Sequence, residues 1–389
     1  MKRKKRVIIL GATGSIGTTA LKALRPYKDQ FEIVALSAHS QITPLIKEAT
    51  YYQCTTVAVT SQSLEMEQES QFLPSTQFYY HKSGLLEMIR SIDADIVLNA
   101  ISGAEGLEPT IVAIESGKDI ALSNKESVVM GGDFLFEMAR KHNVSLIPVD
   151  SEHSTLYALI NGFGKEQVHS LVLTASGGPF RDASIEEMEQ VTVEMALNHP
   201  TWSMGPKITV DSSTLANKGL EVIEASFLFG FDADDIEVVI HPQSVVHSLI
   251  RLHNGALYAQ LSPPDMALPI VSALAQQEIS IRDVVRPLDF SDLNLSFSLP
   301  DTYRFPLLAL AYECVRKKGG YPIVYNAANE VAVEAFFQKR ISFLSISDIV
   351  KHTLEHGWSQ KASSLEEILA IDQRSREVAS TCIQKRGKS

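Results

Sequence analysis

The stretch RVIILGATGSIGTTALKAL, residues 6–24, decides the fold of the N-terminal part of this chain. An apolar run, Arg6–Leu10, predicts a strand, and Thr18–Leu24 has the apolar spacing of a helix. Between them lies Gly11-Ala12-Thr13-Gly14-Ser15-Ile16-Gly17, whose small residues allow a tight turn and a close approach to a pyrophosphate. Strand, loop and helix in this order predict a dinucleotide-binding βαβ unit, with a tight turn that binds nothing as the alternative.

Short apolar runs continue to alternate with helical segments, such as Pro109–Ser116, through the first 150 residues. This alternation is typical of a parallel sheet with helices on both faces, so we expect a Rossmann-like α/β domain. The further strands expected are Phe31–Leu36, Thr56–Val59, Ile96–Asn99, Ile120–Ser123 and Val144–Val149.

After residue 150 the pattern changes to that of an α+β region with an antiparallel sheet. A hairpin is expected where Ser244–Leu252 pairs with Ala256–Gln260 across His253-Asn254-Gly255, because Asn-Gly favours tight hairpin turns. Further expected elements are a helix Ser154–Asn161, strands Ser170–Thr174 and Ile236–His241, and a helix from about Ser212 to Phe229.

Beyond this region a proline-containing connector leads into segments with helical spacing. These segments are Leu307–Lys317, Asn326–Gln338, Ile346–Glu355 and Ser364–Ile371. We therefore predict four parts: an NADPH-binding domain, 1–150; a central catalytic and connective α+β domain, 151–275; a linker, 276–305; and a C-terminal helical domain, 306–389.

Composition excludes several classes of function. The 389-residue chain is 45% hydrophobic and has no run of about 18 apolar residues, which indicates a globular protein with a sizeable core rather than a membrane-spanning one. Its net charge of −11 argues against a nucleic-acid or anionic-membrane binder. Cys54, Cys314 and Cys382 are widely spaced and form no CxxC pair, so we expect a reducing, cytoplasmic location.

The end of the second expected strand bears on the choice of cofactor. NAD enzymes usually carry Asp or Glu there for the ribose 2′-hydroxyl, but this chain has Ala38-His39-Ser40. A 2′-phosphate would be tolerated beside these residues, so the sequence favours NADPH over NADH.

Carboxylates follow the strand that ends near residue 149. In extended chain Asp150 and Glu152 would face the same side, at the strand end where parallel sheets bind ligands. Two close carboxylates favour a hard cation between them, Mg²⁺ or Mn²⁺, although a helix-capping role is the alternative. In a helix, Asn217, Lys218 and Glu221 would share one face, either as a metal and phosphate site or as a surface ion pair.

Two loops offer features of a substrate site. Asp211-Ser212-Ser213-Thr214, at the expected start of a helix, and Ser176-Gly177-Gly178-Pro179 carry hydroxyl groups suited to an anion. Trp202 lies in the Pro- and Gly-containing segment 199–205, which is typical of a lid that closes on a ligand; a buried anchor is the alternative. His241 and His247, in or beside strands, fit structural roles better than catalytic ones.

Taken together in order, these motifs closely resemble the 1-deoxy-D-xylulose 5-phosphate reductoisomerase family. The resemblance runs from about residue 6 to beyond residue 330. It is carried by Gly11–Gly17, Asn124-Lys125-Glu126-Ser127, Asp150–His153, Ser176–Pro179, His199–Gly205, Asn217–Glu221 and His241–His247, with Pro264-Asp265-Met266 and Asn326-Ala327-Ala328-Asn329-Glu330.

The resemblance implies a three-domain enzyme, usually a homodimer, that rearranges a phosphorylated keto sugar to a branched aldehyde and reduces it with NADPH. It implies that Asp150, Glu152 and Glu221 bind Mg²⁺ or Mn²⁺. Residues matching substrate contacts are Lys125, Ser151, Glu152, His199 and Trp202, with Ser176, Ser212, Asn217 and Lys218 at the phosphate. Residues matching NADPH contacts are Thr13, Gly14, Ser15, Ile16, Asn124, Glu126 and Gly205.

One departure from the family pattern concerns the cofactor. Many members have Gly-Lys-Asn after the second strand, whereas this chain has His39-Ser40-Gln41. Gln41 therefore stands beside the position of the lysine expected near the 2′-phosphate. The candidate catalytic residues are Glu152, Lys125 and His199. We expect either Glu152 or a metal-bound hydroxyl to transfer the proton, and His199 mainly to position the substrate.

Two other functions are open at this point. An ordinary NADP dehydrogenase of the aspartate-semialdehyde or homoserine type would share the cofactor domain but would not need the three carboxylates, and would keep its activity in a chelator. A non-enzymatic NADPH sensor would bind the cofactor without turnover, and would leave the metal and phosphate motifs unexplained.

Overall fold

The structure is a computed structural model that describes residues 3–202 and 204–386. The chain divides into two compact units. Unit 1 comprises Met1–Ser127, Leu135–Ser154 and Asp265–Arg286, and unit 2 comprises Val128–Phe134, Thr155–Pro264 and Pro287–Ser389. The four-part division expected from the sequence remains a prediction, and the segment Asp265–Arg286 clusters with the N-terminal residues.

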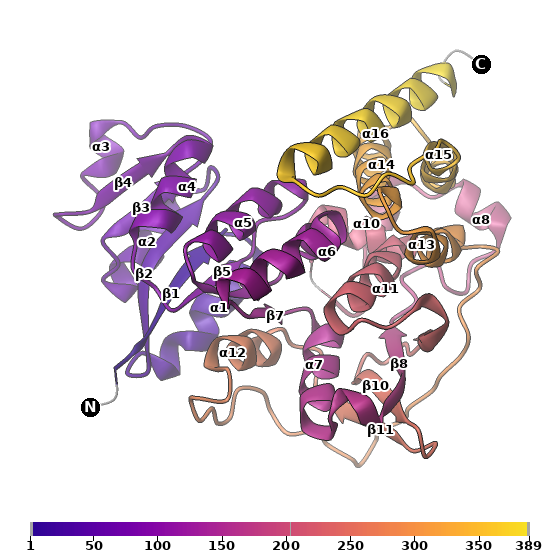
Figure 1. The fold of residues 1–389 in the computed structure, drawn as a ribbon, viewed down its shortest axis with the longest axis horizontal. Coiled ribbons are helices and arrows are strands. Elements are labelled where there is room, and N and C mark those ends of the chain that lie inside the picture. Colours follow the sequence, from indigo (N-terminus) through magenta and orange to yellow (C-terminus); the bar gives the residue numbers. More distant parts are fainter. Residues whose placement is uncertain (1–2, 203, 387–389) are drawn as a thin grey trace. The chain divides into compact units, whose positions relative to one another are not determined.

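Unit 1 is built on a parallel sheet that, within the described residues, has seven strands in the order β4-β3-β2-β1-β5-β6-β7 (Figure 1). The Rossmann-like sheet is therefore confirmed. The strands are β1 Lys5–Leu10, β2 Phe31–Ala38, β3 Thr56–Val59, β4 Gln77–Tyr80, β5 Ile96–Asn99, β6 Asp119–Leu122 and β7 Leu146–Pro148. β4 was not predicted, because Gln77–Tyr80 is short, lies at the sheet edge and has one buried residue.

Helices separate these strands in the chain, as right-handed parallel crossovers require. They are α1 Ser15–Leu24, α2 Ile42–Tyr52, α3 Met66–Glu69, α4 His81–Ser91, α5 Leu107–Glu115 and α6 Lys125–His142, with α12 Ala267–Ala275 added from later in the chain. Short 3₁₀ turns cover Arg25–Tyr27 and Ala104–Gly106. α6 is interrupted at Gly132, whose φ of 43° and ψ of −138° are not helical.

Unit 2 contains a second sheet of four strands among the described residues, in the order β11-β10-β8-β9. The strands are β8 Val168–Ala175, β9 Ile236–Ile240, β10 Val246–Leu252 and β11 Leu257–Leu261. The predicted hairpin is confirmed, since β10 and β11 pair antiparallel. The prediction of a wholly antiparallel sheet is wrong, because β9 pairs parallel to β8 and the chain between them includes helical crossovers.

Helices are the main other elements of unit 2, and most of its core is formed by their apolar faces. They are α7 Ser151–Phe163, which begins in unit 1, α8 Ile185–Glu189, α9 Val193–Ala196, α10 Pro206–Ser213, α11 Ala216–Phe229, α13 Pro306–Lys317, α14 Tyr321–Phe337, α15 Ser345–Leu354 and α16 Leu365–Arg386. Turns of 3₁₀ helix cover Lys165–Gln167 and Ala233–Asp235. The predicted C-terminal helices are confirmed as α13 to α16 (Figure 1).

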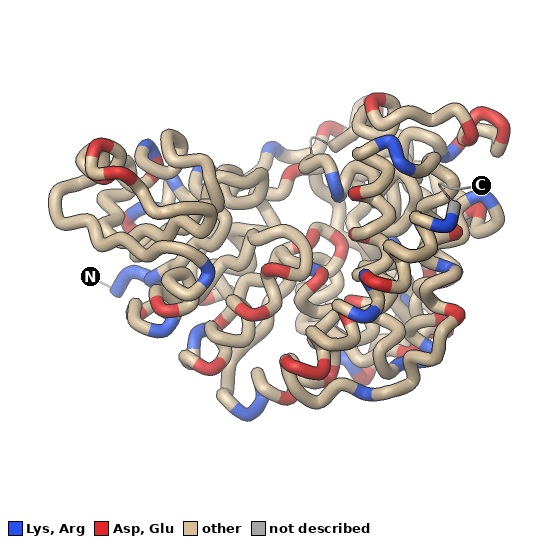
Figure 2. The backbone as a smooth tube through the Cα atoms, turned by 90° about the horizontal axis from the view of Figure 1, so that it is seen from above, with Lys and Arg blue, Asp and Glu red and all other residues tan. Residues whose placement is uncertain are grey.

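Charged residues of both signs are interspersed along the chain of each unit (Figure 2). Basic residues follow one another at the N-terminal end, Arg3–Arg6, while elsewhere in the described chain short runs of the two signs alternate, a distribution typical of a solvated surface. In the part of the chain that the structure describes, no helix is long and apolar enough to cross a membrane.

A close approach between helices in unit 2 depends on Gly219, in α11. A Cβ at this position would overlap the hydroxyl of Tyr325 in α14 and lie 2.9 Å from Ala311 Cβ in α13. Tyr325 is fully buried, and its hydroxyl donates to the Leu307 carbonyl over 3.1 Å. Because neither neighbour lies at a mobile surface, α11 can pack here only with glycine.

We expect Gly219→Ala to lower the free energy of unfolding by about 1–3 kcal/mol, the usual cost of overfilling a packed core. Gly162→Ala is the matched control, since nothing lies within 4 Å of a Cβ at that exposed position of α7. Denaturant unfolding followed by circular dichroism measures both. Equal stability of the two variants would contradict the packing argument.

Candidate active site

The loop between β1 and α1 has the backbone that the nucleotide-binding interpretation requires. Gly11 has a φ of 75°, and a Cβ there would lie 2.7 Å from the Ala100 carbonyl oxygen. A Cβ on Gly17 would overlap the Gly11 carbonyl oxygen and lie 2.6 Å from Ala12 Cα. Gly17 thus brings the first turn of α1 close to the end of β1, and Gly11 allows this turn to lie against the chain that follows β5. Gly14, the N-cap, and Ser15 are exposed at this helix N-terminus and accessible to an anion.

The residues after β2 are placed as the cofactor argument expects. His39, Ser40 and Gln41 are exposed, and Gln41 is the N-cap of α2. His39 Nδ1 lies 2.9 Å from Thr60 Oγ1. None of the three side chains carries an acid, so a 2′-phosphate here would meet no carboxylate from this segment.

Asn124, at the N-cap of α6, is committed to the protein backbone. Its amide nitrogen donates to the carbonyls of Ile101 over 2.8 Å and Gly103 over 2.9 Å, and its Oδ1 accepts from Ser127 N over 2.8 Å. The same nitrogen lies 3.1 Å from Glu126 Oε2. Because its hydrogen-bonding groups are used in this way, Asn124 fixes the loop after β5 against α6.

Lys125 and Asp150 form an ion pair at the carboxyl edge of the unit 1 sheet. Lys125 is the first residue of α6, after β6, and Asp150 follows β7. Lys125 Nζ lies 2.9 Å from Asp150 Oδ2, and Asp150 Oδ1 lies 3.2 Å from His153 Nδ1. Both members of the lysine pair are largely buried, with exposed side-chain fractions of 7% and 15%. Burial strengthens such a pair relative to an exposed one.

Glu152 lies close to Asp150, but not for the reason predicted. The expectation that both residues lie in extended chain is wrong, because α7 begins at Ser151. Asp150 instead accepts a hydrogen bond on Oδ1 from Glu152 N over 3.1 Å, as a helix-capping residue does. Ser151 Oγ donates to Glu152 Oε2 over 2.7 Å. A helix N-terminus favours negative charge, so it stabilises both carboxylates here.

The first turns of α11 carry the second predicted cluster, in unit 2. Asn217 Nδ2 donates to Glu221 Oε1 over 2.5 Å, and Lys218 forms an ion pair with Glu221 Oε2. The shared helical face is therefore confirmed. The surface ion-pair alternative is wrong, since the side chains of Lys218 and Glu221 are only 6% and 1% exposed.

Ser176 and Ser212 also belong to unit 2, and the helix boundary at Ser212 differs from the prediction. A helix starting near Ser212 was expected, but α10 runs from Pro206 to Ser213 and α11 starts at Ala216. Pro206 starts the earlier helix, and Leu215, with a φ of 58°, ends it. A Cβ on Gly178 would lie 2.8 Å from the Ser212 carbonyl oxygen, so the loop after β8 packs on the end of α10.

His199 connects this loop with the segment around Trp202. Its Nδ1 accepts hydrogen bonds from Thr201 N over 3.1 Å and Trp202 N over 2.9 Å, and its Nε2 lies 3.1 Å from Ser176 Oγ. Two backbone donors at Nδ1 require the neutral ring with its proton on Nε2. Burial, and secondarily the charge of Arg181, lower the pKa of His199, which favours the same neutral form.

Trp202 is partly buried, with its ring centroid 6.3 Å from that of His247 in an edge-on arrangement. Gly205, predicted to contact the cofactor, is the N-cap of α10 and has nothing within 4 Å of a Cβ position. Ser203, which belongs to the predicted lid segment, lies outside the described residues.

His241 is held by backbone groups, as expected for a structural histidine. Its Nε2 accepts from Val245 N over 3.2 Å and Val246 N over 3.1 Å, while Nδ1 lies 3.0 Å from the Ser296 carbonyl oxygen. The ring of Phe297 stacks on it at 4.7 Å. His241 thereby fastens part of the segment predicted as a linker to the sheet of unit 2.

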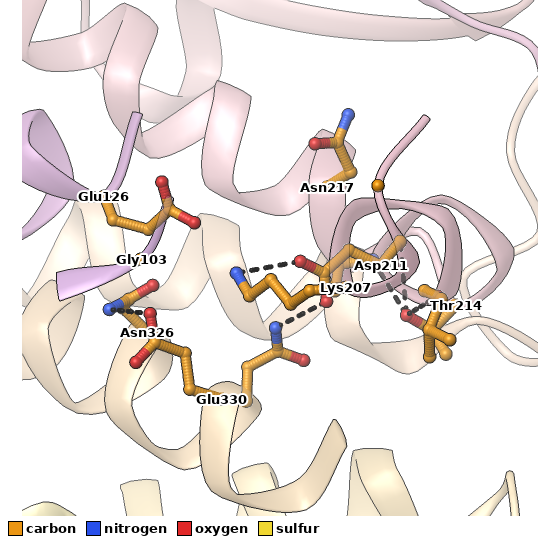
Figure 3. Close-up of polar contacts among 12 residues, drawn as sticks. Gly103, Glu126, Lys207, Asp211, Thr214, Asn217, Asn326 and Glu330 are labelled. Atoms are coloured by element: carbon orange, nitrogen blue, oxygen red, sulfur yellow. Dashed lines mark hydrogen bonds and ion pairs between the residues drawn. The ribbon is translucent and has the colours of Figure 1, made fainter. Parts of the chain in front are cut away.

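The sequence reasoning missed a buried polar group around Asp211, which it treated only as part of an expected helix start. Lys207, in the same helix, contacts the Asp211 carboxylate (Figure 3), and so does Asn329, in α14. The i, i+4 spacing of Lys207 and Asp211 was a usable signal for their pairing. The contribution of Asn329 had no local signal, because 118 positions separate it from Asp211.

Comparison with known proteins gives three family models that match successive parts of the chain. A model described as 1-deoxy-D-xylulose 5-phosphate reductoisomerase matches residues 7–132. The model of that family's C-terminal domain matches residues 146–229, and one described as DXP reductoisomerase C-terminal domain matches residues 261–378.

Curated relatives match over nearly the whole length. The chain is 45% identical over 374 residues to the 1-deoxy-D-xylulose 5-phosphate reductoisomerase of Chloroherpeton thalassium, with 96% of each chain covered. It is 44% identical to that of Bacillus cereus strain Q1, covering 96% of this chain and 98% of the relative. The chain is 43% identical to the chloroplastic 1-deoxy-D-xylulose 5-phosphate reductoisomerase of Mentha piperita, and the match covers 99% of this chain and 83% of the relative.

Solved structures agree with these relatives. A DOX-P reductoisomerase in complex with NADPH, fosmidomycin and magnesium is 38% identical, with a TM-score of 0.90 and 98% of each chain covered. The Zymomonas mobilis 1-deoxy-D-xylulose 5-phosphate reductoisomerase in complex with NADPH is 38% identical, with a TM-score of 0.91, covering 98% of this chain and 99% of that one. On family models, sequence identity and structure together, this chain belongs to the 1-deoxy-D-xylulose 5-phosphate reductoisomerase family.

Proposed function

We propose that this protein converts 1-deoxy-D-xylulose 5-phosphate to 2-C-methyl-D-erythritol 4-phosphate with NADPH and a divalent metal, in the non-mevalonate route to isoprenoids. The observation that carries the proposal is 43–45% identity to reductoisomerases over nearly the whole chain. Two solved relatives support the choice of cofactors, one in complex with NADPH, fosmidomycin and magnesium and the other in complex with NADPH.

We propose that Asp150, Glu152 and Glu221 bind Mg²⁺, or Mn²⁺ in its place. Their donor atoms are carboxylate oxygens, the ligands that hard divalent cations prefer. Asp150 is paired with Lys125, and Glu221 with Lys218. A metal bound there supplies a Lewis acid that polarises adjacent oxygens of the substrate.

The proposed work of the chain's own residues is to bind, orient and move a proton. In this proposal Glu152, whose carboxylate accepts from the Ser151 hydroxyl, exchanges a proton with the substrate, and Lys125, paired with Asp150, contacts the substrate oxygens. His199, neutral and held by two backbone donors, positions the substrate rather than acting as an acid. In this proposal Glu152 performs the acid–base step, while Lys125 and His199 bind and orient the substrate.

The substrate phosphate is assigned to Ser176, Ser212, Asn217 and Lys218. Ser176 follows β8, Ser212 lies in the last turn of α10, and Asn217 and Lys218 lie in the first turn of α11, all in unit 2. Trp202 is assigned to the segment that covers bound substrate. Binding energy from a phosphate remote from the reacting carbons can hold the substrate in its reactive orientation.

NADPH is assigned to the loop of unit 1 and supplies the reducing equivalents. Small residues at Gly11 and Gly17 allow the pyrophosphate to approach the α1 N-terminus. The proposed contacts are Thr13, Gly14, Ser15, Ile16, Asn124, Glu126 and Gly205, with Gln41 near the 2′-phosphate. Asn124 would act mainly by holding the loop 101–103, since its amide is used there.

We also propose a homodimer, in a reducing compartment such as the cytoplasm. β11 is an edge strand of the unit 2 sheet that exposes Leu257, Tyr258 and Leu261. Apolar side chains on an open edge are normally covered by a partner. The three free, buried cysteines fit a reducing location.

The function is tested by following NADPH absorbance with 1-deoxy-D-xylulose 5-phosphate, with and without Mg²⁺. We expect oxidation that stops in excess chelator and returns with Mg²⁺. Glu221→Gln should weaken metal activation by at least about 100-fold. Loss of a residue that only supports a metal ligand costs up to about 100-fold, and the loss of a direct ligand should cost no less. Glu313→Gln, on the exposed face of α13, is the control. Unchanged turnover in chelator would exclude the metal and favour an ordinary dehydrogenase.

The role of His199 predicts a dependence on pH. Because burial lowers the pKa of His199, the ring is neutral above its usual value of about 6.5 and gains a proton only at lower pH. That proton removes the acceptor at Nδ1, so KM for the sugar phosphate should rise as pH falls through the lowered value. His199→Ala should raise KM about tenfold and lose this acidic limb. A fall in kcat with KM unchanged would show that His199 does not position substrate.

The absence of a lysine after β2 predicts that NADPH affinity can be improved. Gln41→Lys should lower KM for NADPH about three- to tenfold and leave KM for NADH unchanged, because only NADPH carries the 2′-phosphate. Thr50→Lys, exposed near the other end of α2, controls for net charge. If both substitutions act alike on NADPH, Gln41 does not lie near the 2′-phosphate.

A further inference from the structure

Asp211 is an almost fully buried carboxylate in the last turn of α10, with 1% of the residue exposed. Its Oδ2 lies 2.9 Å from Lys207 Nζ, one turn earlier in the same helix. Its Oδ1 accepts a hydrogen bond from Asn329 Nδ2, in α14, over 2.7 Å. Both oxygens of the carboxylate are therefore engaged, by partners in two different helices (Figure 3).

The partner in α14 is a fixed point of unit 2. Asn329 is fully buried and lies in the middle of α14, a 17-residue helix. Tyr325, one turn earlier in the same helix, packs against Gly219 of α11. Asn329 Oδ1 has no hydrogen-bond partner among the described residues. A buried amide whose oxygen has no hydrogen-bond partner is unusual. The hydrogen bond from Nδ2 to Asp211 therefore accounts for the orientation of the Asn329 side chain.

The residue that follows Asp211 is Ser212, assigned above to the substrate phosphate. Its backbone is confined from the other side by the loop after β8, since a Cβ on Gly178 would lie 2.8 Å from the Ser212 carbonyl oxygen. Beyond it, Thr214 Oγ1 lies 3.2 Å from the Asp211 carbonyl oxygen, and Ala216 N donates to the same hydroxyl over 3.3 Å. Ser212 thus lies in the last turn of α10, and the orientation of this turn depends on where Asp211 is held.

We propose that Asp211, held between Lys207 and Asn329, is a positioning residue that orients Ser212 toward the substrate phosphate. The proposal rests on the function given above, because it takes Ser212 as a phosphate ligand. Asp211 itself is a carboxylate and would repel a phosphate at close range, which excludes it as a direct ligand. Lys207 balances that charge, so the buried acid can anchor the turn without opposing anion binding.

The test measures the affinity for inorganic phosphate, by thermal shift, together with KM and kcat for 1-deoxy-D-xylulose 5-phosphate. Asp211→Asn keeps the shape and removes the charge. We expect about a tenfold weaker phosphate affinity and a tenfold higher KM for the sugar phosphate. KM for NADPH should be unchanged, and kcat should fall less than threefold.

A double-mutant cycle with Ser212→Ala separates positioning from general damage to the fold. If Asp211 acts through Ser212, Asp211→Asn should change phosphate affinity less than twofold in the Ser212→Ala background. The same tenfold loss in both backgrounds, or a parallel loss of NADPH affinity, would overturn the proposal.

Asn329→Ala provides a second variant if Asp211→Asn does not fold, and it should weaken phosphate binding in the same direction. Asn326→Ala is its matched control, one turn earlier in α14 and equally buried, with its amide directed to Glu330 over 3.4 Å. Equal effects of the two α14 substitutions would overturn the proposal. If the wild-type protein binds phosphate and the cycle holds but no sugar phosphate is consumed, the proposed function fails while the role of Asp211 stands.

Discussion

Charge taken into the interior of a protein must be compensated, and the carboxylates of the proposed metal and phosphate sites depend on this constraint. Asp150 is paired with Lys125, Glu221 with Lys218, and Asp211 with Lys207. Removing one partner of a buried pair leaves a charge that neither water nor protein stabilises. The three lysine–acid pairs therefore restrict where the helix ends that carry them can lie.

Each of these pairs includes a residue at or beside the end of a helix. Lys125 begins α6, Asp150 precedes α7, Lys218 lies in the first turn of α11, and Asp211 in the last turn of α10. Helix ends carry backbone groups that interact with anions and cations, which makes them suitable places for polar ligands. Glycine supports this arrangement at Gly178 and Gly219, where any side chain would displace the neighbouring backbone or ring.

The type of most elements could be predicted from sequence, because hydrophobic periodicity and loop composition are local properties. Strands Thr56–Val59 and Ile96–Asn99 are found with the bounds predicted for them. Failures occurred where local signals were weak or ambiguous. The edge strand β4 buries little, and Asp150-Ser151-Glu152 could be read as extended chain or as a helix start. The helix boundary near Ser212 was displaced because Leu215 adopts a left-handed conformation that its side chain does not favour.

By itself the sequence determined the dinucleotide loop, the parallel order of elements around it, and the shared face of Asn217, Lys218 and Glu221, because each depends on residues close in the chain. Ordered motifs also sufficed to identify the family. Only the tertiary structure decided that the Lys218–Glu221 pair is buried and that Asp211 is held by Asn329. Burial and contacts across 118 positions depend on how helices pack, and packing is set by the whole unit rather than by any local pattern.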